Sequence, residues 1–211
     1  MVGKSTRSAE LTRNKILETA RGLFAKNGYH GTSTAEIVHN ANCNKRMLYH
    51  YFGDKEGLYR EVHESGWKEF RDYMLAEIHS YDPETPVQER LLAAMGSYFD
   101  YYKVRLDSVR LSMWESLEGG KILNDLWDDY RGPLTQVFAA LVNEAQRKGV
   151  LAQGLDPAHL LLSILGANNY YIAFHGTLED ILGAPAMSEE VLEIRKEQFL
   201  LLMKNLFANE V

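Results

Sequence analysis

Nearly every segment of this 211-residue chain carries apolar residues at three- and four-residue intervals, the spacing of one face of an α-helix. The clearest example is residues 16–24, where Ile16, Ala20 and Phe24 share one stripe that ends shortly before Gly28. Alternation of apolar and polar residues, the pattern of a half-buried strand, never continues beyond two or three positions. The pattern therefore predicts an all-α protein.

Glycines, prolines and capping residues divide the helical pattern into segments. Asp54 and Asp156 are candidate N-caps, and Pro157 suits a first helical position. We expect a break or kink at Pro133. The predicted helices are 8–27, 33–41, 45–51, 54–82, 87–103, 106–118, 121–131, 133–148, 157–174 and 188–208.

Charge is distributed unevenly along the chain. Residues 1–60 hold ten Lys and Arg against five acids, a net charge of +5, whereas the rest of the chain has a net charge of −11. This asymmetry predicts that the N-terminal quarter meets a polyanion such as nucleic acid and that the acidic body does not.

Several classes of protein are disfavoured by the sequence. No apolar run approaches the roughly 18 to 20 residues that a membrane span needs, and the first ten residues lack the apolar core of a signal peptide. We therefore expect a cytoplasmic protein with no membrane partner. Cys43 is the single cysteine, so an internal disulfide and a multi-cysteine metal site are excluded.

Residues 12–58 contain the parts of a helix-turn-helix module. Ser33 and Glu36 have the spacing of a capping box at the start of a short helix, and Asn44 can cap a second helix. Asn42 stands in the short turn between them, where a left-handed backbone is tolerated. The second helix, over 45–51, carries basic and aromatic polar side chains that suit the major groove of DNA.

The same stretch strongly resembles the N-terminal domain of the tetracycline-repressor family of bacterial transcription regulators. The matching positions follow the family's spacing without a gap; they are Thr12, Arg13, Ile16, Leu17, Ala20, Leu23, Phe24, Ala25, Gly28, Tyr29, Thr32, Ser33, Ile37, Ala41, Leu48, Tyr49, His50, Tyr51, Phe52, Asp54, Lys55, Glu56 and Leu58. The resemblance implies a helix-turn-helix DNA-binding domain over 1–54 and a larger helical effector-binding and dimerisation domain over 55–211.

The predicted DNA contacts fall into two groups. By resemblance, the residues expected to hold phosphates are Tyr49 and Lys55, with Thr32, Ser33 and Thr34 adding hydroxyl or backbone N–H contacts. The candidates for reading base edges are Lys45, Arg46 and His50, with phosphate contact or plain exposure as the alternative.

The chain departs from the family pattern at the turn and in the second helix. Asn42, Cys43 and Asn44 stand where the family usually has Gly-Val-Ser, and Asn42 and Asn44 keep the turn and the cap feasible. We interpret Cys43 as a small apolar filler rather than a redox switch, since no second cysteine exists. Arg46 replaces a small residue and adds a guanidinium that can bind guanine. The operator sequence of this protein therefore cannot be inferred from the operators of its relatives.

The acidic body is expected, by resemblance, to dimerise and to hold a small effector of unknown identity. The candidate dimer-interface residues are Leu161, Leu165, Phe174, Ile194, Phe199 and Leu202, with internal burial as the alternative. The candidate effector-binding residues are Trp67, Phe70, Met74, Tyr98, Tyr102, Met113, Trp114, Trp127, Phe138, Asn168 and Asn169. Most of these are as well explained by a helical core; for the two asparagines, pocket, dimer contact and internal hydrogen bonding are equally open.

Catalytic residues, a cofactor and a metal site are not expected. Glu36 and His39 have the spacing of di-iron helices, but the second copy that this chemistry needs is missing. Asp125, Asp128 and Asp129 are interpreted as a solvated acidic face, and there is no phosphate-binding glycine loop.

These observations together predict a DNA-binding transcription regulator that is not an enzyme. The favoured form is a repressor that binds a palindromic operator as a homodimer and is released by a small molecule that tilts the helix over 54–82. An activator or a co-repressor-dependent regulator is the alternative. A helical enzyme or ligand carrier with a degenerate DNA-binding module is a remote alternative.

Overall fold

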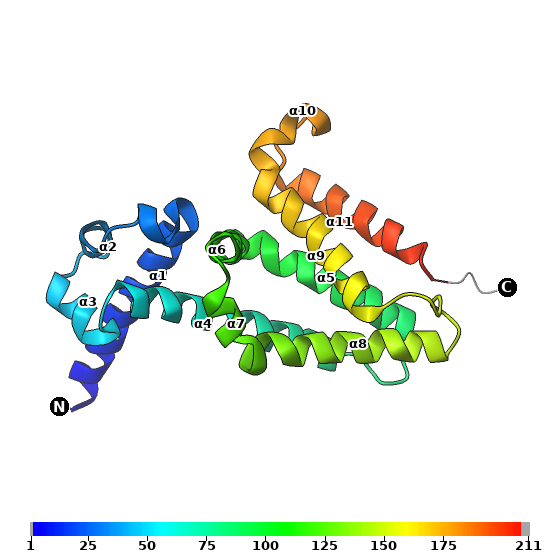
Figure 1. Ribbon diagram of the computed structural model, residues 1–211, viewed down its shortest axis with the longest axis horizontal. Coiled ribbons are helices and arrows are strands. Elements are labelled where there is room, and N and C mark those ends of the chain that lie inside the picture. Colours follow the sequence, from blue (N-terminus) through cyan, green and yellow to red (C-terminus); the bar gives the residue numbers. More distant parts are fainter. Residues whose placement is uncertain (1, 208–211) are drawn as a thin grey trace. The chain divides into compact units, whose positions relative to one another are not determined.

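The computed structural model describes the backbone of residues 2–207 and the side chains of Arg7 and residues 9–207. Helices make up most of this range (Figure 1). Its one strand-like pairing is an isolated antiparallel bridge between Leu151 and Phe207. The all-α prediction is therefore confirmed. None of the helices in the described range is both long enough and apolar enough to cross a membrane.

The helices follow one another with short connections. They are α1 (Val2–Gly31), α2 (Thr34–Asn40), α3 (Lys45–Phe52), α4 (Lys55–His79), α5 (Val87–Val104), α6 (Leu106–Leu117), α7 (Lys121–Asp125), α8 (Gly132–Arg147), α9 (Pro157–Phe174), α10 (Glu179–Leu182) and α11 (Glu189–Lys204). A π-helical turn, η1 (Trp127–Arg131), precedes α8, and a 3₁₀ turn, η2 (His175–Thr177), follows α9.

Helix α1 is longer than the 8–27 predicted, and it is interrupted where the sequence indicated a stop. Gly28 has φ 71° and ψ 178°, so its backbone is not helical, and one further turn follows it. A residue with a Cβ adopts positive φ only at a cost, which is why glycine stands at this break.

The segment predicted as one helix over 121–131 is two elements. Helix α7 ends at Asp125, and η1 occupies residues 127–131 before Pro133 enters the first turn of α8. Pro133 therefore lies inside the start of a helix, where its missing N–H costs nothing, and the irregularity comes just before it. The short helix α10 was not predicted, and its four residues carry no periodic signal.

The described chain divides into two compact units. The first, which we call the reader unit, comprises residues 1–68 and 107–127, and the second, the body unit, comprises residues 69–106 and 128–211. The largest fully buried side chains of the reader unit include Phe24, Ile37 and Leu48. These units are defined by how compactly the chain packs, whereas the predicted boundary at residue 54 separates functions. That boundary stays a prediction.

The core of the body unit lies where α5, α8, α9 and α11 pack together (Figure 1). Its fully buried members include Val87 and Leu91 from α5, Val142 from α8 and Phe199 from α11. Apolar side chains spaced three and four residues apart supply these contacts, as the sequence pattern indicated.

Candidate nucleic-acid interface

Short-range caps set the directions of α2 and α3. The Ser33 hydroxyl accepts a hydrogen bond from the backbone N–H of Glu36 over 3.1 Å, and Asn44 Oδ1 accepts one from Met47 N over 2.9 Å. Asn42, between the two helices, has a positive φ of 51°. These contacts satisfy N–H groups that a helix start leaves free. The caps by the Ser33 and Asn44 side chains and the left-handed turn residue Asn42 are therefore confirmed.

Helix α3 divides cleanly into an inner and an outer face. Leu48 and Phe52 are buried, whereas Lys45, Arg46 and His50 are exposed. Tyr49 is 42% exposed, and its ring lies 5.7 Å from Lys45 Nζ. A short helix that buries one apolar edge and offers two cations, a phenol and an imidazole on the other has the chemistry to meet phosphates and base edges.

The joint between α3 and α4 is close-packed. Asp54 Oδ1 accepts a hydrogen bond from Gly57 N over 2.7 Å and so caps α4, as predicted. A Cβ built on Gly57 would stand 2.2 Å from the Phe52 carbonyl oxygen, so a side chain there would force the two helices apart. The end of the reading helix is thus fixed directly to the start of α4.

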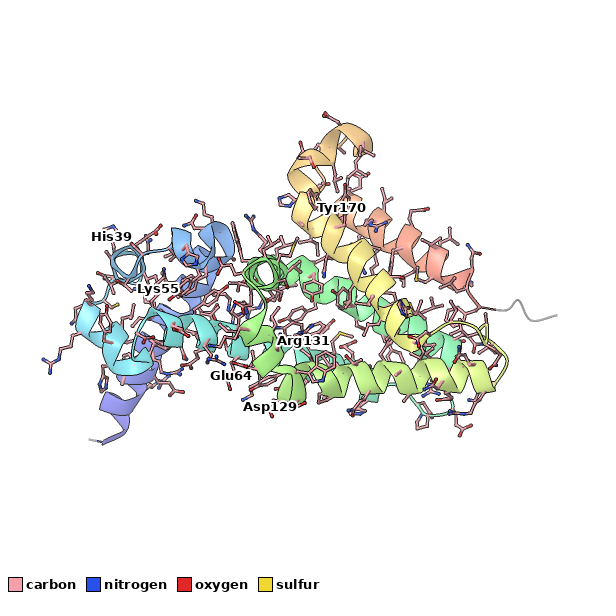
Figure 2. All side chains as sticks on the ribbon, in the orientation of Figure 1. His39, Lys55, Glu64, Asp129, Arg131 and Tyr170 are labelled. Atoms are coloured by element: carbon pink, nitrogen blue, oxygen red, sulfur yellow. The ribbon has the colours of Figure 1, made fainter. Side chains whose placement is uncertain are left out.

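Lys55 is held in place by an aromatic ring. Its Nζ lies 4.1 Å from the centre of the Tyr29 ring, a cation–π contact in the first turn of α4, and Figure 2 labels the lysine there. Burial lowers the pKa of Lys55, and the carboxylate of Glu118 opposes that shift. Tyr29 matches the family pattern, but its role does not follow from the sequence pattern.

Thr32 is inside the module rather than on its surface. The side chain is 1% exposed, and its hydroxyl lies 2.9 Å from the Gly28 carbonyl oxygen and 3.1 Å from that of Leu23. The Thr32 hydroxyl has a single proton, which it donates to one of these two carbonyl oxygens or shares between them. Thr32 therefore leaves the set of predicted DNA contacts, whereas exposed Ser33 and half-buried Thr34 remain in it.

Helix α6 holds the broken end of α1. The Ala25 carbonyl oxygen accepts from Arg110 Nε over 3.1 Å and from Trp114 Nε1 over 3.3 Å. The same indole lies against Gly28, where a Cβ would come within 3.0 Å of two ring carbons. We call this arrangement the α1–α6 clasp. It was missed by sequence analysis, since Trp114 was assigned to the effector site and lies 89 residues from Ala25.

The body unit exposes an apolar surface on α9 and α11. Its members, which we call the α9/α11 face, are Leu162, Tyr170, Phe174, Ile194, Leu201 and Leu202, each between 47% and 62% exposed. Tyr170, labelled in Figure 2, stacks on Phe174 with ring centres 4.7 Å apart. A surface of this kind marks a protein–protein contact.

The predicted dimer residues are only partly on that face. Phe174, Ile194 and Leu202 belong to it, and Leu161 and Leu165 are half-buried beside it. Phe199 is 1% exposed and lies in the core of its own subunit, so it leaves the predicted dimer set. Helical period alone does not tell which of two apolar edges on α11 is turned inward.

The predicted effector residues divide between the two units. Those in the reader unit are Trp67, Met113, Trp114 and Trp127, of which Trp127 is 44% exposed. Those in the body unit are Phe70, Met74, Tyr98, Tyr102, Phe138, Asn168 and Asn169. The structure brings together Phe70, Tyr98 and Tyr102 as packed rings, and Tyr98 donates a hydrogen bond to Asn169 Oδ1 over 3.0 Å. Phe138 packs instead against the core.

Metal-binding geometry is absent from the part of the chain that the structure describes, which contains no group of three His, Cys, Asp or Glu side chains able to hold an ion. Asp125 pairs with Arg60 over 2.7 Å. Asp128 and Asp129 are exposed on the π-helical turn, as expected of a solvated acidic face.

Comparisons with known proteins agree with this geometry. A sequence model described as bacterial regulatory proteins, tetR family, matches residues 16–62, and one described as tetracyclin repressor-like, C-terminal domain, matches residues 86–201. The HTH-type transcriptional regulator RutR of Escherichia coli is 27% identical over 194 residues, covering 89% of this chain and 86% of its own. The HTH-type transcriptional repressor NicS of Pseudomonas putida is 28% identical over 183 residues, covering 85% and 84%.

Solved structures share the fold. AibR, crystallised with isovaleryl coenzyme A and operator DNA, superposes with a TM-score of 0.73 at 22% identity, covering 90% of this chain and 97% of its own.

Proposed function

This chain belongs to the tetracycline-repressor family of bacterial transcription regulators, and from that membership we propose that it is a repressor that leaves its operator when a small molecule binds. It is a DNA-binding regulator that acts as a dimer, like its family. The finer parts of the proposal are the repressor role, the release by effector and the residues that carry each step. The observation that carries the DNA-binding role is the exposed outer face of α3, fixed at both ends by Asn44 and by the Gly57 joint.

We assign the DNA contacts as follows. Lys45, Arg46 and His50 meet base edges, while Tyr49 and Lys55 hold phosphates, with Ser33 and Thr34 at the start of α2 adding to them. One short reading helix covers few base pairs, so a dimer that places two of them in successive major grooves gains affinity by avidity. The α9/α11 face supplies the apolar area for that dimer.

We propose that release runs through α4. Helix α4 is one continuous helix whose first part, to residue 68, belongs to the reader unit and whose remainder belongs to the body unit. A ligand in the body that favours one position of α4 therefore changes the setting of α3 through the Gly57 joint. Coupling of about 1–3 kcal/mol would change operator affinity about 5- to 150-fold.

No catalytic role is proposed. The relatives are named as regulators. The division into residues 1–54 for DNA binding and 55–211 for effector binding and dimerisation is part of this proposal. So is a cytoplasmic location, since the protein must reach DNA.

The test is selection from random duplex DNA by the purified full chain, followed by affinity measurements on the enriched site. We expect a palindrome with half-site centres about 34–36 Å apart or a multiple of that spacing. The Lys45→Ala/Arg46→Ala variant should enrich nothing while unfolding at the same temperature as the wild type. If the wild type also enriches nothing, the ligand-free repressor is the wrong assignment.

A promoter fusion then decides the direction of regulation. With the selected site placed between a promoter and a reporter, a repressor lowers expression and an activator raises it. Induction by a metabolite extract should restore expression only when α3 is intact, and if the extract strengthens repression instead, the co-repressor alternative replaces release by effector.

A further inference from the structure

One arginine of the reader unit joins three helices. Arg13, on α1, lies with its guanidinium carbon 5.2 Å from the centre of the Phe52 ring, which belongs to α3. Its Nη2 also donates a hydrogen bond to Glu61 Oε1 on α4, and the two side chains form an ion pair. A guanidinium is planar, so one face can rest on a ring while an edge binds a carboxylate. We call this arrangement the Arg13 tie.

The tie acts on the end of the reading helix. Phe52 is the last residue of α3 and is 7% exposed. A helix of eight residues has little stability of its own, so the packing of its apolar side chains sets its direction. Those buried side chains are Leu48 and Phe52, and Arg13 contacts the second of them. A displacement of the Phe52 ring therefore changes the direction in which the outer face of α3 points.

The other end of the tie is on the helix that carries a proposed phosphate contact. Glu61 stands six residues after Lys55, about 9 Å further along α4. The Lys55 ammonium group rests on the ring of Tyr29, which is also on α1. Helix α4 is thus held to α1 at two separate places, and the end of α3 is held to the same helix through Phe52. The tie therefore relates the direction of α3 to the position of Lys55.

That relation matters because the two kinds of DNA contact have different tolerances. A phosphate contact depends mainly on charge and survives small displacements. A bidentate contact with a base edge needs two hydrogen bonds of about 2.7–3.2 Å in a set direction, so it is lost when the helix tilts. Loosening α3 against α4 should thus remove sequence discrimination and leave general DNA binding in place.

We propose that Arg13 is a positioning residue for sequence reading, which acts through Phe52 and Glu61 and does not itself contact DNA. This inference rests on the proposed function, because it names what holds the reading helix at the angle that the operator requires. The competing role is a direct phosphate contact, since the Arg13 side chain is 35% exposed and carries a positive charge. The two roles predict opposite effects for the carboxylate of Glu61.

The test measures the binding of purified full-length variants to the selected operator and to a scrambled duplex of the same composition. Glu61→Gln removes a negative charge, which would strengthen binding to both duplexes if Arg13 held a phosphate. A positioning role needs that carboxylate, so we expect Glu61→Gln and Arg13→Gln each to lower the ratio of operator affinity to scrambled-duplex affinity about tenfold. The variant with both substitutions should lose no more than either single variant, because both changes break the same tie.

A second ion pair in the reader unit supplies the control. Arg60 Nη2 and Asp125 Oδ2 lie 2.7 Å apart, with similar exposure, on α4 and α7 rather than on α3. Arg60→Gln and Asp125→Asn repeat the two changes of charge and should leave the affinity ratio unchanged. The midpoint of thermal unfolding should fall by less than about 4 °C in either tie variant, as expected for a partly exposed ion pair. A much larger fall in both tie variants would assign Arg13 to stability instead of reading.

Failure of this inference can be told apart from failure of the proposed function. Tighter binding of Glu61→Gln to both duplexes would make Arg13 a phosphate contact, and an unchanged affinity ratio in Arg13→Gln would leave the tie without a role in reading. In either case the wild type would still prefer its operator, so the proposed function would stand. If selection with the wild type yields no operator, the proposed function fails, and this inference fails with it.

Discussion

The outer face of α3 and the α9/α11 face have opposite chemistry, although each is an exposed helical surface. The first offers Lys45, Arg46 and His50, and the second offers leucines, an isoleucine and two aromatic rings. In the proposed function, binding of DNA to the first face depends on charge and weakens steeply with salt, whereas burial of the second face in a dimer depends on apolar area and is nearly independent of salt. A regulator built this way can leave DNA without falling apart into monomers.

The strongest test of the comparison puts charge on the apolar face. Ile194→Glu together with Leu202→Glu should separate the dimer, because carboxylates would have to be buried against leucines. Operator affinity should then fall about 100-fold or more through loss of avidity. Sedimentation and fluorescence anisotropy measure the two effects. Ala140→Glu with Asn143→Glu places the same charges on exposed positions of α8 and should change neither. An intact dimer in the first variant would remove the α9/α11 face from the proposal.

The reader unit contains a buried histidine, His63, which is 2% exposed and should make the stability of the protein depend on pH. Burial lowers the pKa of His63 from 6.5 to about 4. The unfolded chain therefore binds a proton below pH 6.5 that the folded chain refuses, and stability falls as the pH drops from 6.5 to 4. The loss from this one group should reach about 3 kcal/mol. Urea unfolding at pH 7 and pH 4 should show that the loss is smaller by this amount in His63→Phe, and an unchanged loss would argue against a neutral, buried imidazole.

Arg46 tests whether the charged face reads sequence. Arg46→Ala should cost about 1–3 kcal/mol on operators that carry the preferred base and much less on operators changed at that base pair. Arg46→Lys keeps the charge but loses the forked geometry, so it should behave like alanine if guanine is bound at two points. An equal loss on all sequences would assign Arg46 to the phosphate backbone. Binding titrations on single-base operator variants distinguish the two.

The smallest expected effect concerns the salt dependence. Lys55→Ala should lower the slope of log affinity against log salt by about 0.9, as expected for one lost phosphate contact, and should do so on every sequence. The dimer dissociation constant, measured over the same salt range, should stay nearly flat. A slope that is unchanged in the variant would place Lys55 away from the DNA.

Features of the fold and the site were predictable from the sequence where they depend on interactions between residues close together in the chain. Ser33, Asn44 and Asp54 cap helices through contacts three residues away, so their roles follow from local spacing alone. The outward direction of Lys45 and Arg46 follows in the same way from the inward positions of Leu48 and Phe52. The fold class and the recognition helix were therefore predictable.

Longer-range contacts were not predictable from spacing. Thr32 turns inward because the break at Gly28 leaves a carbonyl for it, and Trp114 serves the α1–α6 clasp because α6 packs on α1. Phe199 faces its own core because α11 packs on α5. Each outcome depends on which elements meet, and one sequence with helical period is compatible with several arrangements.

The contact between Lys55 and Tyr29 affects the side-chain entropy that Lys55 would lose on binding a DNA phosphate. A lysine on a bare helix surface samples many rotamers, and fixing it on a phosphate costs up to about 2 kcal/mol of side-chain entropy. Lys55 gives up most of that freedom when the protein folds, because its ammonium group already rests over the Tyr29 ring. In the proposed contact of Lys55 with a DNA phosphate, Tyr29 would therefore contribute by holding the ammonium group in place before DNA binds.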